Sequence, residues 1–318
     1  MTFSKSKVLC PLNGEFDTTL VESLKTSDIT ALYQKQLSID VSSEFGSVQE
    51  ISLYHCLKSD LKFFYPLISG SESFYEKLQR IDWYYLDEKY EYYYAQKFIR
   101  KTDHVLEIGC GNGLFAKQIS VEKYRGIEFS QKAKLDAGSL GIEVLNESIQ
   151  VHVKSYSSVY DVVCAFQVLE HVTEITSFIE SSLLCLKPGG FLIYSVPSAD
   201  SFLSAAKNNI LNMPPHHVSW WSDKALTYIS QRFELEIVDI KHERLADIHK
   251  KSYLAYIVLE SLSKKLNFHF SLVNRSWTYR FFAKLSEMIA TFLIEGMNVP
   301  EMLPNGHSVI AVYRKPKS

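Results

Sequence analysis

The run VLEIGCGNG at residues 105–113 constrains the fold of this chain more than any other feature. Glycine is scarce, with 13 among 318 residues, yet three of the 13 fall between Gly109 and Gly113. The run follows a predicted strand, His104–Ile108, and precedes Leu114–Ile119, which reads as a helix. Glycines at a strand-to-helix turn let the backbone approach a ligand and direct free N–H groups at it. We therefore expect a turn that binds a nucleotide-like cofactor; the alternative is a tight turn without a ligand.

Short apolar runs alternate with helix-like segments from about residue 103 to residue 241. The runs are His104–Ile108, Tyr124–Glu128, Glu143–Leu145, Asp161–Phe166, Phe191–Val196 and Leu235–Ile240. This alternation is typical of a doubly wound α/β fold, with a mostly parallel sheet and helices on both faces. Residues 249–297 read as helices, and Ser308–Arg314 returns as a strand. The pattern predicts a helical insertion, about 249–305, before the last strand of the sheet.

The chain divides into two regions by composition. Residues 1–70 mix short apolar alternations with Gly and Pro and predict a small, partly β unit. Residues 71–318 form the predicted main domain. Its first part, residues 71–100, lacks Gly and Pro and is rich in aromatic residues, which favours one or two helices.

Composition limits the partners and the compartment. The net charge of −2 gives no basic footprint for nucleic acid. Five cysteines, an odd number in a long chain, favour free thiols and the cytoplasm. The first thirty residues contain no long apolar run, so we expect no secretory signal. Charged residues interrupt the apolar stretches Tyr253–Leu262 and Phe281–Met297, so we expect no membrane span.

The charges around the glycines indicate which cofactor the turn accepts. A dinucleotide fingerprint G-x-G-x-x-G requires glycine at position 114, where this chain has Leu114. Glu107 precedes the glycines; it would repel a pyrophosphate and suits a cationic amine. Glu128 closes the next predicted strand, where an acid can accept hydrogen bonds from ribose hydroxyls. A ribose together with an ammonium group points to S-adenosylmethionine.

Four runs occur in a fixed order: VLEIGCGNG, GIEFS, YDVVCAFQVLEHV and LKPGGFLIYSVP. In this order they resemble the motifs of class I S-adenosylmethionine-dependent methyltransferases, nearest to the ubiquinone-type and sugar or glycan branch. The resemblance covers roughly residues 71–242 and 306–314. It implies a seven-stranded, Rossmann-like sheet and methyl transfer that leaves S-adenosylhomocysteine.

The resemblance also implies which residues bind the donor. The methionine moiety would lie against Glu107, Gly109, Cys110, Gly111, Asn112, Gly113 and Gln167. Glu128 would hold the ribose, Phe129 one face of the adenine, and Glu147 and Ser148 the adenine edge.

Gln167 begins a motif that holds a divalent metal in ubiquinone-type relatives, where it reads E-x-x-E-H. Here an amide replaces the first carboxylate, which removes one negative charge. We therefore expect no bound Mg²⁺. Glu170 and His171 then either contact the acceptor or have a structural role, as a helix-start acid and a packed histidine.

The loop MPPHHVSWWS, residues 213–222, is the second polar cluster. Its histidines are candidates for the base that deprotonates the acceptor, ranked His217, His216 and then His171. Trp220 and Trp221 are predicted to form a wall over the sulfonium. The alternative is a loop fixed by its prolines, with indoles that cap the sheet.

Cys10 and Cys56 each begin what resembles a degenerate C-x-x-C pair of the kind that binds zinc at the start of several glycan methyltransferases. Asn13 and Ser59 replace the second cysteines, so we expect a relic without zinc.

Aromatic side chains are dense before residue 100. Most read as helix packing, and Tyr84, Tyr85 and Tyr90 are candidates for contact with the cofactor or acceptor.

Together these features predict O-methylation of a small polar acceptor such as a sugar or glycan intermediate. The alternatives are a quinol or catechol acceptor, an NAD-dependent oxidoreductase, and a non-catalytic module that binds S-adenosylmethionine. The sequence indicates neither the acceptor nor the oligomeric state.

Overall fold

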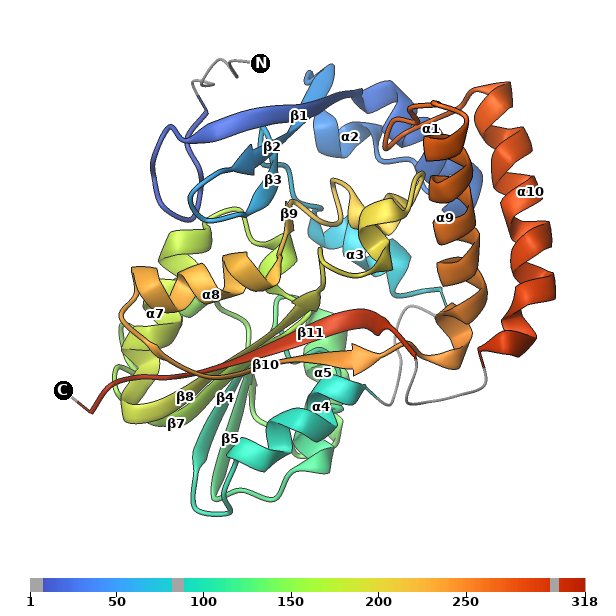
Figure 1. Ribbon diagram of the computed structural model, residues 1–318. Helices are drawn as coiled ribbons and strands as arrows, with labels where there is room; N and C mark the ends of the chain where they lie inside the picture. The colour runs from blue at the N-terminus through green and yellow to red at the C-terminus, as the bar shows by residue number, and fades with distance from the viewer. Residues whose placement is uncertain (1–7, 82–88, 298–302, 318) are drawn as a thin grey trace.

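The strand that precedes the glycines, β4, lies inside a seven-stranded sheet (Figure 1). The computed structural model describes residues 8–81, 89–297 and 303–317. The strands lie in the order β10-β11-β8-β7-β4-β5-β6. Their bounds are β4 His104–Ile108, β5 Lys123–Ile127, β6 Val144–Leu145, β7 Tyr160–Phe166, β8 Leu186–Pro197, β10 Glu236–Arg244 and β11 Asn305–Arg314.

The sheet is mostly parallel, as the sequence predicts. The strands from β8 to β6 pair in parallel, and β11 pairs antiparallel with both β8 and β10. Each apolar run that the sequence assigns to a strand lies on one of the seven strands, within a few residues of its bounds. The expected doubly wound α/β fold is therefore confirmed.

Alternate side chains of the central strands face two different layers of helices. Leu106 packs in the cluster that holds α7, Ile175–Cys185, and α8, Asp223–Arg232. Its neighbour Val105 packs in the cluster that holds α4, Tyr90–Ala95. This alternation is the two-residue period of a strand, so the apolar runs are covered on both faces.

The segment after the glycines differs from expectation. Residues 114–119 were predicted as a helix, and the structure has only a 3-10 turn, Ala116–Gln118. Only residues 114–122 separate Gly113 from β5, which is too short for a full helix and its return to the sheet. The next crossovers carry α5, Gln131–Ser139, and α6, Ile149–His152.

A second sheet contains the three strands that the structure describes in the N-terminal region. It has the order β1-β2-β3-β9, where β1 is Thr18–Lys25, β2 Glu50–Cys56, β3 Lys62–Tyr65 and β9 Ser219–Trp220. Helices α1, Thr26–Leu37, and α2, Ser42–Phe45, follow β1. Because β9 comes from the loop after β8, the region 1–70 shares its sheet with the main domain. A separate unit over 1–70 stays a prediction.

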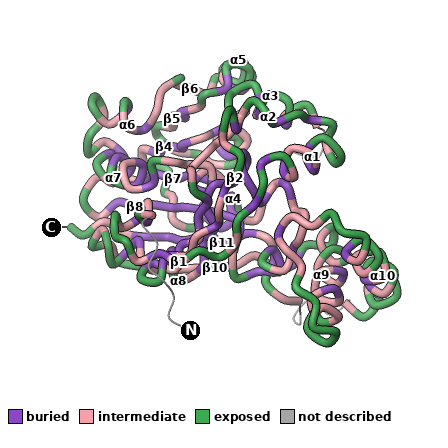
Figure 2. Tube along the Cα trace, turned by 90° about the horizontal axis from the view of Figure 1, so that it is seen from above, coloured by how far each residue is buried: buried purple, intermediate pink, exposed green. Residues whose placement is uncertain are grey.

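Two long helices form the insertion before β11. Helix α9, Asp247–Lys265, and α10, Trp277–Leu293, lie side by side at one edge of the molecule (Figure 1). Seen from above, the pair projects from the rest and is mostly exposed or half-buried (Figure 2). Across the described residues, we find no helix that has both the length and the apolar character to cross a membrane.

Candidate functional site

A cavity of about 1300 Å³ opens at the carboxyl ends of β4, β5 and β7. This is the edge where open α/β sheets bind ligands. Helix α3, Glu72–Leu78, and α4 also contribute to its wall. The predicted site residues that line the cavity are Tyr90, Gly109, Cys110, Gly111, Asn112, Glu128, Phe129, Glu147, Ser148, Gln167, Glu170, His171, His216 and His217.

The glycine bend requires glycine at two points. Gly109 has φ +71°, and a Cβ there would lie 2.6 Å from Cγ2 of Val168. Gly113 has φ +77°, and its Cβ would lie 2.5 Å from Cδ1 of Ile142. A side chain at either position would meet both backbone strain and a clash. Gly109 lines the cavity, whereas Gly113 lies behind it.

Glu128 bridges the bend and the start of α5. Its Oε2 accepts a hydrogen bond from the backbone N of Gly111 at 3.0 Å, and its Oε1 accepts one from the backbone N of Ser130 at 2.9 Å. Two backbone donors thus fix the carboxylate at the cavity wall. A carboxylate held in this way keeps further lone pairs for hydroxyl donors of a ligand.

Glu107 lies under the bend and not on the cavity wall. Its side chain is buried and accepts a hydrogen bond from the hydroxyl of Tyr124. Burial raises the pKa of Glu107 to about 8. Glu107 is therefore not among the residues that line the cavity, whereas Gly109, two residues later, is.

The predicted adenine end is formed by β5, β6 and α6. Phe129 is 63% exposed and presents its ring at the wall. Glu147 pairs with His152 at 2.7 Å, and the hydroxyl of Ser148 caps α6 by accepting from the backbone N of Val151. Phe129 therefore offers a free ring face, whereas Glu147 and Ser148 each have a partner inside the protein.

Gln167 has a positive φ of 57°, directly after β7. Its amide Nε2 donates to Ser195 Oγ at 3.0 Å and lies 3.3 Å from Glu91 Oε1 and from Ser308 Oγ. The side chain is thereby tied to β8, β11 and α4.

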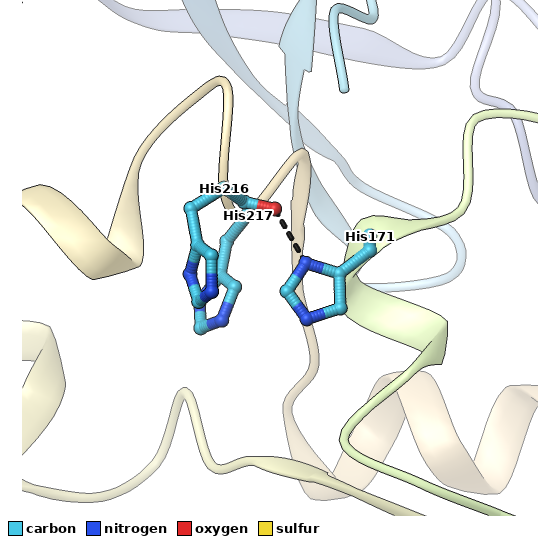
Figure 3. A group of neighbouring side chains, drawn as sticks. All are labelled: His171, His216 and His217. Atoms are coloured by element: carbon cyan, nitrogen blue, oxygen red, sulfur yellow. Dashed lines mark hydrogen bonds between the residues drawn. The ribbon is translucent and has the colours of Figure 1, made fainter. Parts of the chain in front are cut away.

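Glu170, His171, His216 and His217 meet at one side of the cavity. Figure 3 shows the three histidines. Neighbouring rings of the three histidines have centroids 4.4 to 5.0 Å apart. Burial lowers the pKa of His171 to about 4 and that of His216 and His217 well below the usual value. Burial raises the pKa of Glu170 to about 8. The structure thus brings the three predicted bases together as neutral imidazoles.

The two tryptophans lie in the core, which differs from the predicted wall over the sulfonium. The ring of Trp220 packs edge-on against Phe64 and donates its Nε1–H to the carbonyl of Asn212 at 2.8 Å. Trp221 is fully buried and donates to Ser219 Oγ at 3.0 Å. Strand β9 pairs with β3, and Trp220 packs in the N-terminal core while Trp221 packs in the core cluster of the main sheet.

Of the three candidate tyrosines, Tyr90 lines the cavity and stacks on Tyr94 with centroids 5.8 Å apart. Tyr84 and Tyr85 lie outside the described residues.

The degenerate cysteine pairs come together near the N-terminus. Cys10 Sγ lies 3.5 Å from Ser59 Oγ, and Cys56 Sγ lies 3.5 Å from Asn13 Nδ2. The residues that replace the second cysteine of each pair thus make hydrogen-bond contacts with the remaining thiols. In the described part of the chain, all five cysteines are free and buried.

Sequence reasoning missed several polar residues of the cavity, among them Tyr75, Glu91 and Lys89. The hydroxyl oxygen of Tyr75 lies 3.1 Å from His171 Nδ1, and this hydroxyl donates to the carbonyl of His216 at 3.5 Å. Glu91 is buried, and burial raises its pKa. Lys89 lines the same wall. The only signal for Glu91 was a lone acid inside the run YEYYY, a pattern that a helix surface also produces.

Comparisons with known proteins identify one family. A family model described as a methyltransferase domain matches residues 78–240. The ubiquinone biosynthesis O-methyltransferase of Escherichia coli is 35% identical over 99 residues, which cover 29% of this chain and 41% of that protein. The protein with the same description from Pectobacterium atrosepticum is 33% identical over 99 residues, with the same coverage. The match spans about two fifths of the length of these curated relatives.

Solved structures with a similar chain path have low identity to this chain. A SAM-dependent methyltransferase from Archaeoglobus fulgidus is 16% identical, with a TM-score of 0.46 over 77% of this chain and 95% of that chain. A possible histamine N-methyltransferase from Thermotoga maritima is 15% identical, with a TM-score of 0.46 over 77% of this chain and 97% of that chain.

Proposed function

This chain belongs to the methyltransferase domain family, and on that basis we propose that it transfers the methyl group of S-adenosylmethionine to a hydroxyl oxygen of a small polar acceptor. Membership confirms the class that the four ordered motifs predict, an S-adenosylmethionine-dependent methyltransferase domain with that donor as its cofactor. Which acceptor the whole protein uses, and which residues bind it, are parts of the proposal.

The observation that carries the proposal is the set of carboxyl groups around the glycine bend. Glu128 and Glu91 line the cavity, and Glu107 lies beneath the bend. S-adenosylmethionine carries an ammonium and a sulfonium against one carboxylate, so it is a net cation. Carboxyl groups at low dielectric favour such a ligand and disfavour a pyrophosphate, which argues against a dinucleotide and hence against an NAD-dependent oxidoreductase.

The donor would lie along the carboxyl edge of the sheet. Glu128 would accept hydrogen bonds from the ribose hydroxyls, since its carboxylate is already oriented by Gly111 and Ser130. The exposed ring of Phe129 would stack on the adenine. The methionine end would then point toward Gln167 and the histidine cluster, and the methyl group toward the free part of the cavity.

Methyl transfer requires alignment more than bond activation, because the sulfonium carbon is already electrophilic. The acceptor oxygen must approach in line with the S–CH₃ bond and lose its proton. The bond from sulfur to carbon breaks, the bond from carbon to oxygen forms, and the thioether product leaves. The residues nearest to this reaction are His217, His216 and His171, whose low pKa values make each of them a weak base when it acts alone.

The preferred acceptor is a sugar or a glycan intermediate. Carboxyl, imidazole and amide groups on the cavity wall suit an acceptor with several hydroxyls. The curated relatives, named for ubiquinone biosynthesis, favour a quinol or catechol as the second candidate.

We also propose that the protein acts in the cytoplasm and that nucleic acid is not its acceptor. Free thiols fit a reducing compartment, and a net charge of −2 does not attract a polyanion.

The test is an activity panel with S-adenosylmethionine labelled in its methyl group. Nucleotide sugars, surface glycans, catechols and polyprenyl quinols are offered in parallel, and label is followed into each product. Label in a sugar or glycan supports the proposal, whereas label only in a catechol or quinol replaces the acceptor class. If S-adenosylmethionine binds tightly but no acceptor is methylated, the chain is a non-catalytic binding module. If calorimetric titration detects binding of NAD and none of S-adenosylmethionine, methyl transfer is overturned.

A further inference from the structure

We propose that the histidine cluster binds one divalent transition-metal cation of the zinc type, with His171, His216, His217 and Glu170 as its ligands. This departs from the predicted metal-free site, because the motif at Gln167, Glu170 and His171 lacks one carboxylate and by itself offers few ligands. The structure adds two histidines from the distant loop 213–222 to the same point in space (Figure 3).

The three imidazoles are already close enough to share one ion. One nitrogen atom from each lies within 4.8 Å of the other two. Metal–nitrogen bonds of about 2.0–2.1 Å bring tetrahedral ligand atoms to about 3.4 Å from one another. The required approach is on the order of 1 Å, which rotation of the rings about their side-chain torsions can supply.

Carbonyl oxygens orient all three rings. The Nδ1–H of His171 donates to the carbonyl of His216 at 2.5 Å. That of His216 donates to the carbonyl of Leu211 at 2.8 Å, and that of His217 to the amide oxygen of Asn212 at 3.1 Å. Each contact places the proton on Nδ1 and the lone pair on Nε2. Metal-binding histidines are held in this way, with the other ring nitrogen bonded to an oxygen acceptor.

Glu170 is the independent observation that points to a cation. It is 1% exposed, and neither carboxyl oxygen has a hydrogen-bond partner among the described residues. Its Oε1 lies 3.9 Å from Nε2 of His171 and 3.9 Å from Nε2 of His217. A buried carboxyl without a partner is costly, and a cation between it and the lone pairs of neutral imidazoles removes that cost.

The donor set determines the kind of metal. Imidazole nitrogen suits Zn²⁺, Fe²⁺, Co²⁺ and Ni²⁺, whereas Mg²⁺ prefers oxygen ligands and keeps several waters. Three imidazoles and one carboxylate therefore select a transition metal. The set also differs from the E-x-x-E-H pattern, since Gln167 is bonded to Ser195 and its place is taken by histidines of another loop.

The proposed role of the ion rests on the proposed function. The histidine cluster lines the same cavity as the proposed donor site, so an acceptor hydroxyl can bind to the metal and face the methyl group. A metal-bound hydroxyl is more acidic than a free one, and its proton leaves to solvent. This would explain how a cavity with weakly basic histidines deprotonates an alcohol.

The test measures metal binding separately from turnover. Protein stripped with a chelator is titrated by calorimetry with Zn²⁺, Co²⁺ and Mg²⁺, while S-adenosylhomocysteine binding is measured on the same samples. We expect one equivalent of Zn²⁺ or Co²⁺, no binding of Mg²⁺, and a visible Co²⁺ spectrum typical of nitrogen and oxygen ligands. His217→Gln and Glu170→Gln should each weaken Zn²⁺ binding at least tenfold.

Two controls separate this site from others. His249→Gln changes a histidine of the same cavity outside the cluster and should leave Zn²⁺ affinity unchanged. A Cys10→Ser, Cys56→Ser double variant removes both thiols of the N-terminal relic and should also leave the Zn²⁺ affinity unchanged.

Two results would overturn the metal site. One is no Zn²⁺ or Co²⁺ binding by stripped protein that still binds S-adenosylhomocysteine. The other is Zn²⁺ binding that is as tight in the His217→Gln variant as in wild type. In either case the proposal of methyl transfer is unaffected. Binding of Zn²⁺ without any binding of S-adenosylhomocysteine would contradict the proposed function and still support the metal site.

Discussion

The carboxylate of Glu128 is held by the backbone N–H groups of Gly111 and Ser130, so its orientation is set by the fold. We expect Glu128→Ala to weaken binding of S-adenosylhomocysteine about 10- to 150-fold, since a hydrogen bond to a charged group contributes about 1.5–3 kcal/mol. Calorimetric titration measures the change. Glu143→Ala, an exposed acid paired with Arg125 outside the cavity, is the matched control and should bind as wild type does. Equal affinity in Glu128→Ala would remove Glu128 from the donor site.

Glu107 makes the stability of the ligand-free protein depend on pH. Burial raises its pKa from 4.5, the ordinary value of a glutamate carboxyl in water, to about 8 in the folded chain. Between these values the folded state binds more protons than the unfolded state, so this group's contribution to the free energy of unfolding falls as pH rises. Relative to Glu107→Gln, wild type should lose about 1.4 kcal/mol per pH unit between pH 5 and 8. Urea unfolding at several pH values tests this, and a constant difference between the two proteins would contradict it.

At the level of elements, the bend after β4 depends on glycine. Gly109→Ala introduces a Cβ at φ +71° and 2.6 Å from Val168, so it should lower stability by about 2 kcal/mol or more and weaken donor binding at least tenfold. Gly138→Ala is the contrast. Gly138 lies in α5 with open space around it, and alanine there should stabilise the chain by about 0.5–1 kcal/mol. Thermal unfolding and calorimetry measure both variants, and equal stability of the two would show that the bend tolerates a side chain.

The positions of the strands could be predicted from the sequence, because their apolar runs are local signals that a parallel sheet requires on both faces. Their order in the sheet was not predicted, since it depends on long-range pairing. His104–Ile108 is a strand with the bounds that the sequence indicates. The short turn at Ala116–Gln118 was missed, since LFAKQI has the composition of a helix and only the proximity of β5 prevents one. Likewise, the composition of the loop 213–222 predicted that both its histidines and its tryptophans lie at the site. Trp220 and Trp221 became core because β9 pairs with β3, a long-range contact that local composition does not encode.

At the scale of the molecule, helices α1 and α3 support the wall of the cavity. The hydroxyl of Tyr33, on α1, bonds to the carbonyls of Ile210 and Met213, at the start of the loop that carries His216 and His217. Helix α3 supplies Tyr75 to the same cluster. The histidines are thus positioned by Tyr33 and Tyr75, which lie far from them in the sequence, and this explains why their convergence was not visible in the sequence.

This shared packing predicts that both sheets unfold together. Trp220 fills the space beside Phe64 in the N-terminal core, so Trp220→Ala should cost about 3–5 kcal/mol. Far-UV circular dichroism and tryptophan fluorescence should give coincident urea transitions in wild type and, at lower urea, in the variant. Trp277→Ala, at a residue 77% exposed on α10, should change the free energy of unfolding by less than about 0.5 kcal/mol. Two separated transitions in wild type would mean that the N-terminal sheet folds as an independent unit and that the pairing of β9 with β3 does not couple it to the main domain.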